Sequence, residues 1–232
     1  MKTIGLLGGM SWESTVSYYT AINHGIKERL GGLSSAKICM YSVNFAEIEE
    51  LQHKGLWDKT AQILSDAAVS IETGGADFLL ICTNTMHKVA PQIESRISIP
   101  ILHIADATAE MLILHGIRKV GLLGTRFTMD QDFYKKRITD KYGISVVVPS
   151  SEDKNTIHNI IYEELCQGII TEQSRDAYLK VIDKLKHEGA EAVILGCTEI
   201  ALLVQQKHTN VPLFDTTAIH ANATILRSLG EG

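Results

Sequence analysis

The 232-residue sequence lacks the features that mark several large classes of protein. No apolar run approaches the roughly 20 residues that a membrane-spanning helix needs, so we expect no membrane partner. The lysines and arginines are scattered over a chain of net charge −5 and form no basic stripe, so we expect no nucleic-acid partner. No short-spaced pair of metal ligands recurs along the chain, and we therefore expect no metal.

Signals of export and of nucleotide binding are also missing. The N-terminal apolar segment is short and broken by glycine, which favours a first β-strand over a secretion signal. Its glycine-rich part, GLLGGMS at residues 5–11, matches neither GxGxxG nor GxxxxGK(S/T), so no nucleotide cofactor is expected. Without an export signal, the widely spaced cysteines are expected to be reduced thiols of a cytoplasmic protein. These cysteines are Cys39, Cys82, Cys166 and Cys197.

The sequence does contain a regular alternation of strand-like and helix-like segments. Continuous runs of Ile, Val and Leu are typical of strands that are covered on both faces. These runs lie at 3–8, 37–43, 77–82, 99–104, 119–124, 144–149, 192–197 and 211–215. Amphipathic helical patterns lie between them, for example at 57–75, which ends on a glycine pair suited to a helix C-cap. The alternation predicts an α/β fold with parallel sheets.

Three sequence motifs occur twice and in the same order. They are GLLG at 5–8 and 121–124, Gly-Ala-acid before an apolar strand at 75–81 and 189–195, and IPIL at 99–102 echoed by VPLF at 211–214. Three ordered pairs indicate an internal duplication, and hence two related α/β units. Aligned on Gly-Ala-acid, Cys197 of the second copy falls opposite Thr83 of the first.

The duplicated strand ends are where we expect chemistry. Parallel strands present ligand sites at their carboxyl ends, next to helix N-termini. Two such units facing each other would bring Thr83 and Cys197 to opposite walls of one cleft. Cys82 has the opposite strand parity and is expected in the core of its own unit.

Each candidate residue also has a plain structural interpretation. At a helix N-terminus the pKa of the Cys197 thiol is expected to fall, although many cysteines are simply buried and structural. Thr83, Asn84 and Thr85 offer hydroxyls and an amide suited to a carboxylate, or they cap a helix. Thr125 belongs to the same class of strand-end hydroxyls. His87, on the helical turn that follows, is expected to be a supporting structural donor rather than a catalyst.

Taken together, the motifs resemble one enzyme family over the whole chain. The motifs are GLLGGMS, x-N-T-x-H at 83–87, GCTE at 196–199 and a closing (F/I)D-x-x-x-x-H/A. They are similar to those of the aspartate/glutamate racemases, most closely the L-aspartate/glutamate-specific branch. The resemblance implies two pseudo-symmetric three-layer α/β domains, each with a mainly parallel sheet flanked by helices, an active site in the interdomain cleft, and a homodimer. The expected domains are 1–98 with 211–232, and 99–210.

By the same resemblance, the protein is a cofactor-independent amino-acid racemase, an isomerase of D-amino-acid metabolism. Its substrate is a small acidic amino acid, with L-aspartate and/or L-glutamate preferred. Racemisation needs one group to remove the α-proton and another to deliver one on the opposite face. The implied catalytic pair is Cys197, as base and acid, and Thr83, as the weaker partner. The implied substrate-binding residues are Met10, Gln52, Asn84, Thr85, Thr125, Thr198 and Glu199.

The sequence departs from the family at three positions. Members usually carry a second cysteine where this chain has Thr83. They often carry an arginine and a lysine for the side-chain carboxylate, and the nearest positions here are Gln52 and Cys166. Two alternatives therefore stay open. One is a single-cysteine decarboxylase or isomerase of small dicarboxylic acids, and the other is a catalytically impaired carboxylate-binding protein.

Overall fold

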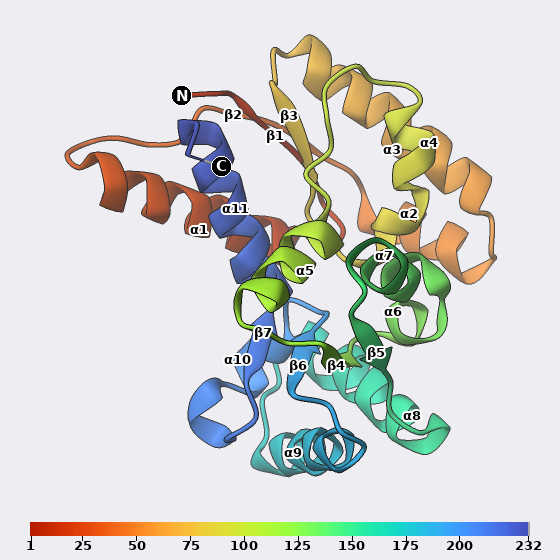
Figure 1. Ribbon diagram of the computed structural model, residues 1–232. Coiled ribbons are helices and arrows are strands. Elements are labelled where there is room, and N and C mark those ends of the chain that lie inside the picture. Colours follow the sequence, from red (N-terminus) through yellow and green to blue (C-terminus); the bar gives the residue numbers. More distant parts are fainter. Residues whose placement is uncertain (232) are drawn as a thin grey trace. The chain divides into compact units, whose positions relative to one another are not determined.

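The computed structural model describes residues 1–231 and divides the chain into two compact units (Figure 1). Unit 1 comprises residues 1–104 and the segment from residue 220 onward, and unit 2 comprises residues 105–219. Each unit contains one parallel β-sheet flanked by helices, which confirms the predicted α/β fold class. Within residues 1–231, none of the helices combines the length and hydropathy that crossing a membrane requires.

The sheet of unit 1 has the strand order β2-β1-β3, with all strands parallel. Its strands are β1 (Ile4–Gly8), β2 (Ile38–Ser42) and β3 (Phe78–Ile81). Every residue of the central strand is buried, as its continuous apolar sequence predicts, whereas the edge strand β2 is half exposed. The strand expected at 99–104 is reduced to a single parallel bridge between Ile101 and Leu79.

Helices cover both faces of this sheet (Figure 1). Its helical elements are α1 (Trp12–Leu30), α2 (Phe45–His53), α3 (Trp57–Thr73), the 3₁₀ turn η1 (Thr85–Val89), α4 (Ala90–Glu94) and the last part of α11 (Thr216–Leu229). On one face, Leu64 and Ile71 of α3 pack on Leu79. On the other face, α1 and α11 pack on Ile4 and on Cys82, which is fully buried in the core, as expected.

The sheet of unit 2 repeats this topology with one more strand, in the order β5-β4-β6-β7. Its strands are β4 (Lys119–Leu123), β5 (Ser145–Val147), β6 (Ala192–Leu195) and β7 (Leu213–Asp215). Its helical elements are α5 (Ile104–Leu114), α6 (Arg126–Asp130), α7 (Asp132–Tyr142), α8 (Ser151–Asn159), the π-turn η2 (Ile160–Glu164), the 3₁₀ turn η3 (Leu165–Gln167), α9 (Glu172–His187), α10 (Ile200–Leu203), the 3₁₀ turn η4 (Gln206–His208) and the start of α11.

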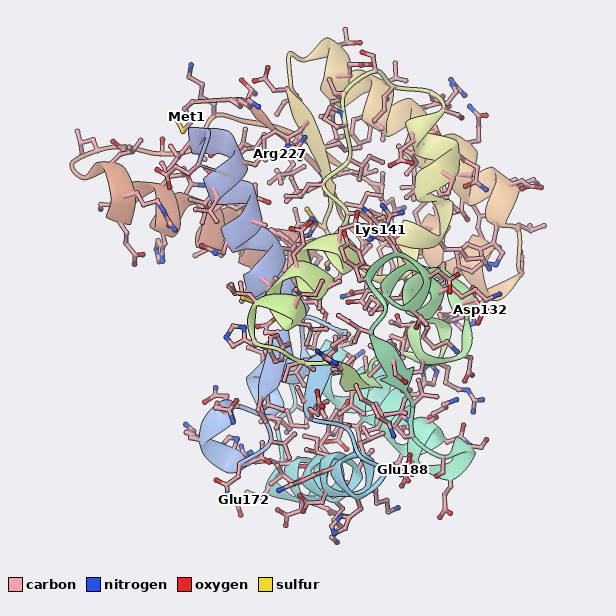
Figure 2. All side chains as sticks on the ribbon, viewed as in Figure 1. Met1, Asp132, Lys141, Glu172, Glu188 and Arg227 are labelled. Atoms are coloured by element: carbon pink, nitrogen blue, oxygen red, sulfur yellow. The ribbon has the colours of Figure 1, made fainter. Side chains whose placement is uncertain are left out.

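An ion-pair network joins two helices of unit 2. Asp106 of α5 accepts hydrogen bonds from Arg137 Nε and Nη2 at 2.6 and 2.8 Å, and from Lys141 Nζ at 2.8 Å. Lys141, labelled in Figure 2, lies near the end of α7. Burial raises the pKa of the Asp106 carboxyl, but the two cations outweigh it and hold that pKa below its usual value.

The strand register confirms the internal duplication. Leu7 of β1 lies opposite Ile81 of β3, and Leu123 of β4 lies opposite Leu195 of β6. Thr83 and Cys197 therefore occupy the same position in the two copies, two residues beyond the last paired residue of β3 and of β6. The unit boundaries fall at 104/105 and 219/220, later than the expected domain boundaries at 98/99 and 210/211. The difference at the second boundary arises because β7 pairs with β6.

Candidate active site

In unit 1, the loops that follow β1 and β3 form a strand-end cluster of Met10, Thr83, Asn84 and Thr85. The turn after β1 requires glycine at residue 9, which has a φ of +88° and approaches the backbone of Val43 so closely that a Cβ would lie 2.2 Å from its carbonyl oxygen. The Gly9 N–H donates to Thr15 Oγ1 at 2.8 Å, which ties this turn to α1. The Met10 side chain packs into the apolar core on the α3 face of the sheet.

Two successive carbonyl groups after β3 are held by side chains. Ser14 Oγ donates to the Cys82 carbonyl at 2.9 Å, and His87 Nδ1 lies 2.8 Å from the Thr83 carbonyl. Thr83 itself is partly exposed, whereas Asn84 and Thr85 are buried. The Asn84 side chain does not cap η1, so simple capping is not its role. This backbone support fixes the position from which the Thr83 hydroxyl projects.

Gln52 is the remaining site residue expected from unit 1. It lies near the end of α2 and is buried, with 4% of its surface exposed. At the position where the family resemblance implies an arginine, this chain thus has a buried neutral amide. A neutral amide can donate hydrogen bonds to a carboxylate but brings no compensating charge.

In unit 2, the loops after β4 and β6 form a second strand-end cluster of Thr125, Cys197, Thr198 and Glu199. Thr125 caps α6, since its hydroxyl accepts the Thr128 N–H at 3.4 Å. Thr125 therefore has at least the structural role of a helix cap. Thr198 accepts a hydrogen bond from Thr217 Oγ1 at 3.4 Å, which ties the cysteine loop to the start of α11.

The thiol of Cys197 is paired with a carboxylate. Its Sγ donates to Glu199 Oε2 at 2.8 Å, and the side chain is only partly exposed. Burial raises the pKa of Cys197, and the negative charge of Glu199 raises it further. The expected lowering of this pKa is therefore wrong. The helix that follows, α10, has only four residues, too short to supply much of a stabilising dipole.

Two residues beside the start of α11, Thr216 and Asp215, support this part of unit 2, although no site role was expected for them from the sequence. Thr216 Oγ1 donates to the carbonyl of Leu195, the last residue of β6, at 3.0 Å. Asp215 Oδ1 accepts the backbone N–H groups of Thr217 and Ala218, and burial raises the pKa of its carboxyl. The closing motif FD-x-x-x-x-H was the signal that could have assigned these residues a role.

The two clusters place both expected catalytic groups at the carboxyl ends of two corresponding strands, β3 and β6. With a raised pKa, the Cys197 thiol is protonated at neutral pH, as is the hydroxyl of Thr83, so the resting groups are proton donors. Only the deprotonated form of Cys197, the thiolate, could act as a base. The opposition of Thr83 and Cys197 stays a prediction. Among residues 1–231, no three His, Cys, Asp or Glu side chains are grouped as metal ligands.

Comparisons with known proteins agree with this architecture. The profile of the Asp/Glu/hydantoin racemase family matches residues 7–224. A crystal structure assigned to the Asp/Glu racemases from Yersinia pestis is 57% identical, covering 99% of this chain and 100% of the other, with a TM-score of 0.94. An aspartate racemase homologue from Pyrococcus horikoshii is 36% identical, covering 99% and 100%, with a TM-score of 0.88. The broad specificity amino-acid racemase of Bacillus subtilis is 23% identical over 96% of each chain.

Proposed function

Since the chain belongs to the Asp/Glu/hydantoin racemase family and is a racemase of the isomerase class, we propose that it interconverts the enantiomers of acidic amino acids. The proposed substrates are aspartate and/or glutamate, with Cys197 and Thr83 as the catalytic pair. One observation carries this proposal. The two residues occupy the same register position in the two copies of the duplicated sheet, and each is a proton-bearing group at a strand end.

The proposed mechanism is a two-base proton transfer. The thiolate of Cys197 removes the α-proton of the L-enantiomer, and the hydroxyl of Thr83 delivers a proton to the opposite face of the carbanion. The products are the D-enantiomer, a neutral thiol and a threonine alkoxide. A proton then passes from the thiol to the alkoxide through solvent, which restores the starting state. A thiol and a hydroxyl suffice for these steps, so we propose that no cofactor takes part.

The two groups differ in strength, which makes the mechanism asymmetric. A hydroxyl is a weaker acid than a thiol, so the carbanion formed from the L-enantiomer is reprotonated more often by Cys197 than by Thr83. In D2O, that return introduces deuterium without inversion when the Cys197 thiol exchanges its proton with solvent before it gives the proton back. The enantiomers have equal free energies, so kcat/KM is the same in both directions, and the asymmetry appears in kcat and KM separately and in α-hydrogen exchange.

Preference for an acidic substrate is proposed from the hydrogen-bond donors of both clusters and of Gln52. Hydroxyls at Thr85, Thr125 and Thr198 and amides at Asn84 and Gln52 can bind carboxylate oxygens. The P. horikoshii homologue is described as related to an aspartate racemase, in line with this choice. Because neutral donors replace the arginine and lysine of related sequences, we expect weak binding of the side-chain carboxylate, with a high KM.

Chiral chromatography tests the proposed function. Each enantiomer of aspartate, glutamate, asparagine, glutamine and alanine is incubated with the wild type, with Cys197→Ser and with a matched thiol control, Cys39→Ser, on β2. We expect inversion of the acidic pairs by the wild type and by the control, and none by Cys197→Ser. Inversion of the neutral amino acids alone would overturn the acidic preference. Release of CO2 from substituted malonates, with no inversion of any amino acid, would replace the racemase proposal with a decarboxylase.

We also propose a cytoplasmic homodimer. Its support in unit 1 is an exposed apolar patch on α1 and the edge strand β2, formed by Trp12, Val16, Tyr19 and Met40. Exposed patches of this kind on an edge strand mark association surfaces. Sedimentation of the wild type is expected to give a dimer, and Trp12→Glu with Tyr19→Glu is expected to give a monomer. A wild-type monomer at micromolar concentration would refute the proposal.

A further inference from the structure

Unit 1 contains a buried cluster of histidines that the proposed chemistry does not use. His87 of η1, His103 and His220 of α11 are 2%, 3% and 0% exposed. The ring centroids of His87 and His103 lie 4.4 Å apart, and those of His87 and His220 lie 6.0 Å apart. The hydroxyl of Tyr18, on α1, lies 2.9 Å from His220 Nδ1. Buried polar rings of this number require defined hydrogen-bond partners.

The partners of His87 fix its tautomer. Nδ1 lies 2.8 Å from the Thr83 carbonyl oxygen, which can only accept, so Nδ1 carries the hydrogen. Nε2 lies 3.2 Å from the backbone nitrogen of Ile104, whose N–H can only donate, so Nε2 is the acceptor. Both contacts require the same neutral Nδ1–H ring. A doubly protonated ring would place a hydrogen against the Ile104 N–H.

The partners of His220 fix the opposite tautomer. Its Nε2 lies 2.7 Å from the carbonyl oxygen of Leu102, so Nε2 carries the hydrogen and Nδ1 accepts from the Tyr18 hydroxyl. Burial lowers the pKa of His220 to about 4, so this ring is also neutral at pH 7. Side chains of α1, η1 and α11 and the backbone of residues 102–104 are thereby joined in one hydrogen-bonded core.

This core holds the strand end that carries Thr83. Ile104 is the last residue of unit 1 before the chain enters unit 2, and His220 is the first residue after the chain returns. His87 thus connects the backbone of Thr83 to Ile104, in the segment that leaves unit 1. His220, in the segment that returns to unit 1, binds the backbone of Leu102 in that same leaving segment. The second copy of the repeat has no histidine at the position of His87, since Ala201 falls there when the repeats are aligned on Gly-Ala-acid.

We propose that His87 is a positioning residue for the reaction. In its Nδ1–H form it clamps the Thr83 carbonyl and anchors it to Ile104, so that the hydroxyl of Thr83 keeps the alignment needed to deliver a proton. The catalytic part of this inference rests on the proposed function. The alignment of the Thr83 hydroxyl matters because a misplacement of about 1 Å can cost on the order of 100-fold in rate. Thr83 is the weaker proton donor of the pair, so its step is the one we expect to limit inversion.

Two variants separate the two hydrogen bonds of His87. His87→Asn keeps a donor near the Nδ1 position for the Thr83 carbonyl, and His87→Gln keeps an acceptor near the Nε2 position for Ile104. With L-aspartate or L-glutamate in D2O, we expect His87→Gln to slow inversion on the order of 10- to 100-fold while exchange at the Cys197 face continues, so that the exchange-to-inversion ratio rises. His87→Asn is expected to keep a ratio near that of the wild type.

The matched control is His187→Gln. His187 of α9 makes the same kind of contact, from Nδ1 to the carbonyl of Asp183 four residues earlier, at 2.7 Å, but it is exposed. No change is expected from it. An unchanged ratio in His87→Gln would overturn the proposal. Equal losses of exchange and inversion in both His87 variants, together with a lowered melting temperature, would reduce His87 to a structural role and overturn it as well.

A measurement independent of activity keeps this test separate from that of the proposed function. Imidazole ¹⁵N NMR at pH 7 is expected to show His87 as the Nδ1–H tautomer and His220 as the Nε2–H tautomer, assigned with single His→Gln variants. If the wild type inverts no amino acid, the proposed function fails, but this spectrum still decides whether His87 holds the Thr83 carbonyl. An Nε2–H or doubly protonated His87 would overturn the clamp.

Discussion

Replacing Glu199 with glutamine is expected to move the pH dependence of the reaction toward acid. In the wild type, the Glu199 carboxylate lies 2.8 Å from Cys197 Sγ, and its charge adds to the effect of burial in raising the thiol pKa. Glutamine keeps the size of the side chain and removes the charge. The Cys197 thiolate, which we propose as the base for the α-proton, is then present at lower pH.

The magnitude follows from the separation and from the partial exposure of the thiol. Two charges about 4 Å apart interact by about 1 kcal/mol in water and about 4 kcal/mol at an effective dielectric constant of 20. One pKa unit corresponds to about 1.4 kcal/mol, so loss of the charge is worth roughly 1–3 units, and partial exposure favours the lower end. We expect a shift of about 1–2 units in the midpoint of the kcat profile.

Two assays check this expectation. One is kcat for L-aspartate or L-glutamate between pH 6 and 10. The other is the pH dependence of iodoacetamide alkylation of Cys197, measured in a Cys166→Ser background because Cys166 is exposed. Glu188→Gln, which removes an exposed charge at the end of α9, is the control and is expected to leave both profiles in place. If the midpoint of either pH profile is unchanged or lies at higher pH in Glu199→Gln, the reasoning is refuted.

Three further predictions concern the catalytic pair and the stability of unit 2. Cys197→Ser should lower inversion of acidic amino acids by at least about 1,000-fold and abolish α-hydrogen exchange of the L-enantiomer, since a serine hydroxyl is scarcely ionised at neutral pH; retention of a tenth of the exchange would exclude Cys197 as the base. Thr83→Cys should raise kcat for D-to-L conversion about tenfold or more, because a thiolate forms far more readily than an alkoxide; an unchanged kcat, with the fold intact by circular dichroism, would count against Thr83. Asp106→Asn should lower the free energy of unfolding by about 1–2 kcal/mol at pH 7, a modest value because Lys141 is half exposed. The lowered pKa of Asp106 means that this contribution is present above about pH 4 and is lost as pH falls through the folded-state pKa, so urea denaturation should show a smaller difference between variant and wild type at pH 3 than at pH 7. An equal difference at both pH values would contradict this assignment.

The sequence was informative where the determinants of structure are local. Apolar runs bounded by glycine mark the central strands, and the repeated GLLG and Gly-Ala-acid motifs place Thr83 and Cys197 at equivalent positions, as the register confirms. The strand expected at 99–104 is too long, because this segment makes only one β-bridge. The sequence of an apolar run at a sheet edge does not distinguish one bridge from a full strand pairing.

Tertiary contacts decided the rest. The helix after Glu199, α10, has only four residues and ends at Leu203, and the bond from Cys197 to Glu199 reverses the expected direction of the thiol pKa shift. The roles of Tyr18 and His220 depend on a contact between residues far apart in the chain, which no local pattern contains. Those contacts are what position the strand ends.

Proton NMR of each enantiomer of aspartate and glutamate in D2O tests the central claim most directly. If Cys197 is the strong base and Thr83 the weak partner, the L-enantiomer loses its α-hydrogen signal faster than it inverts, whereas the D-enantiomer inverts at least as fast as it exchanges with retention. Equal ratios of exchange to inversion for the two enantiomers would contradict that division of roles.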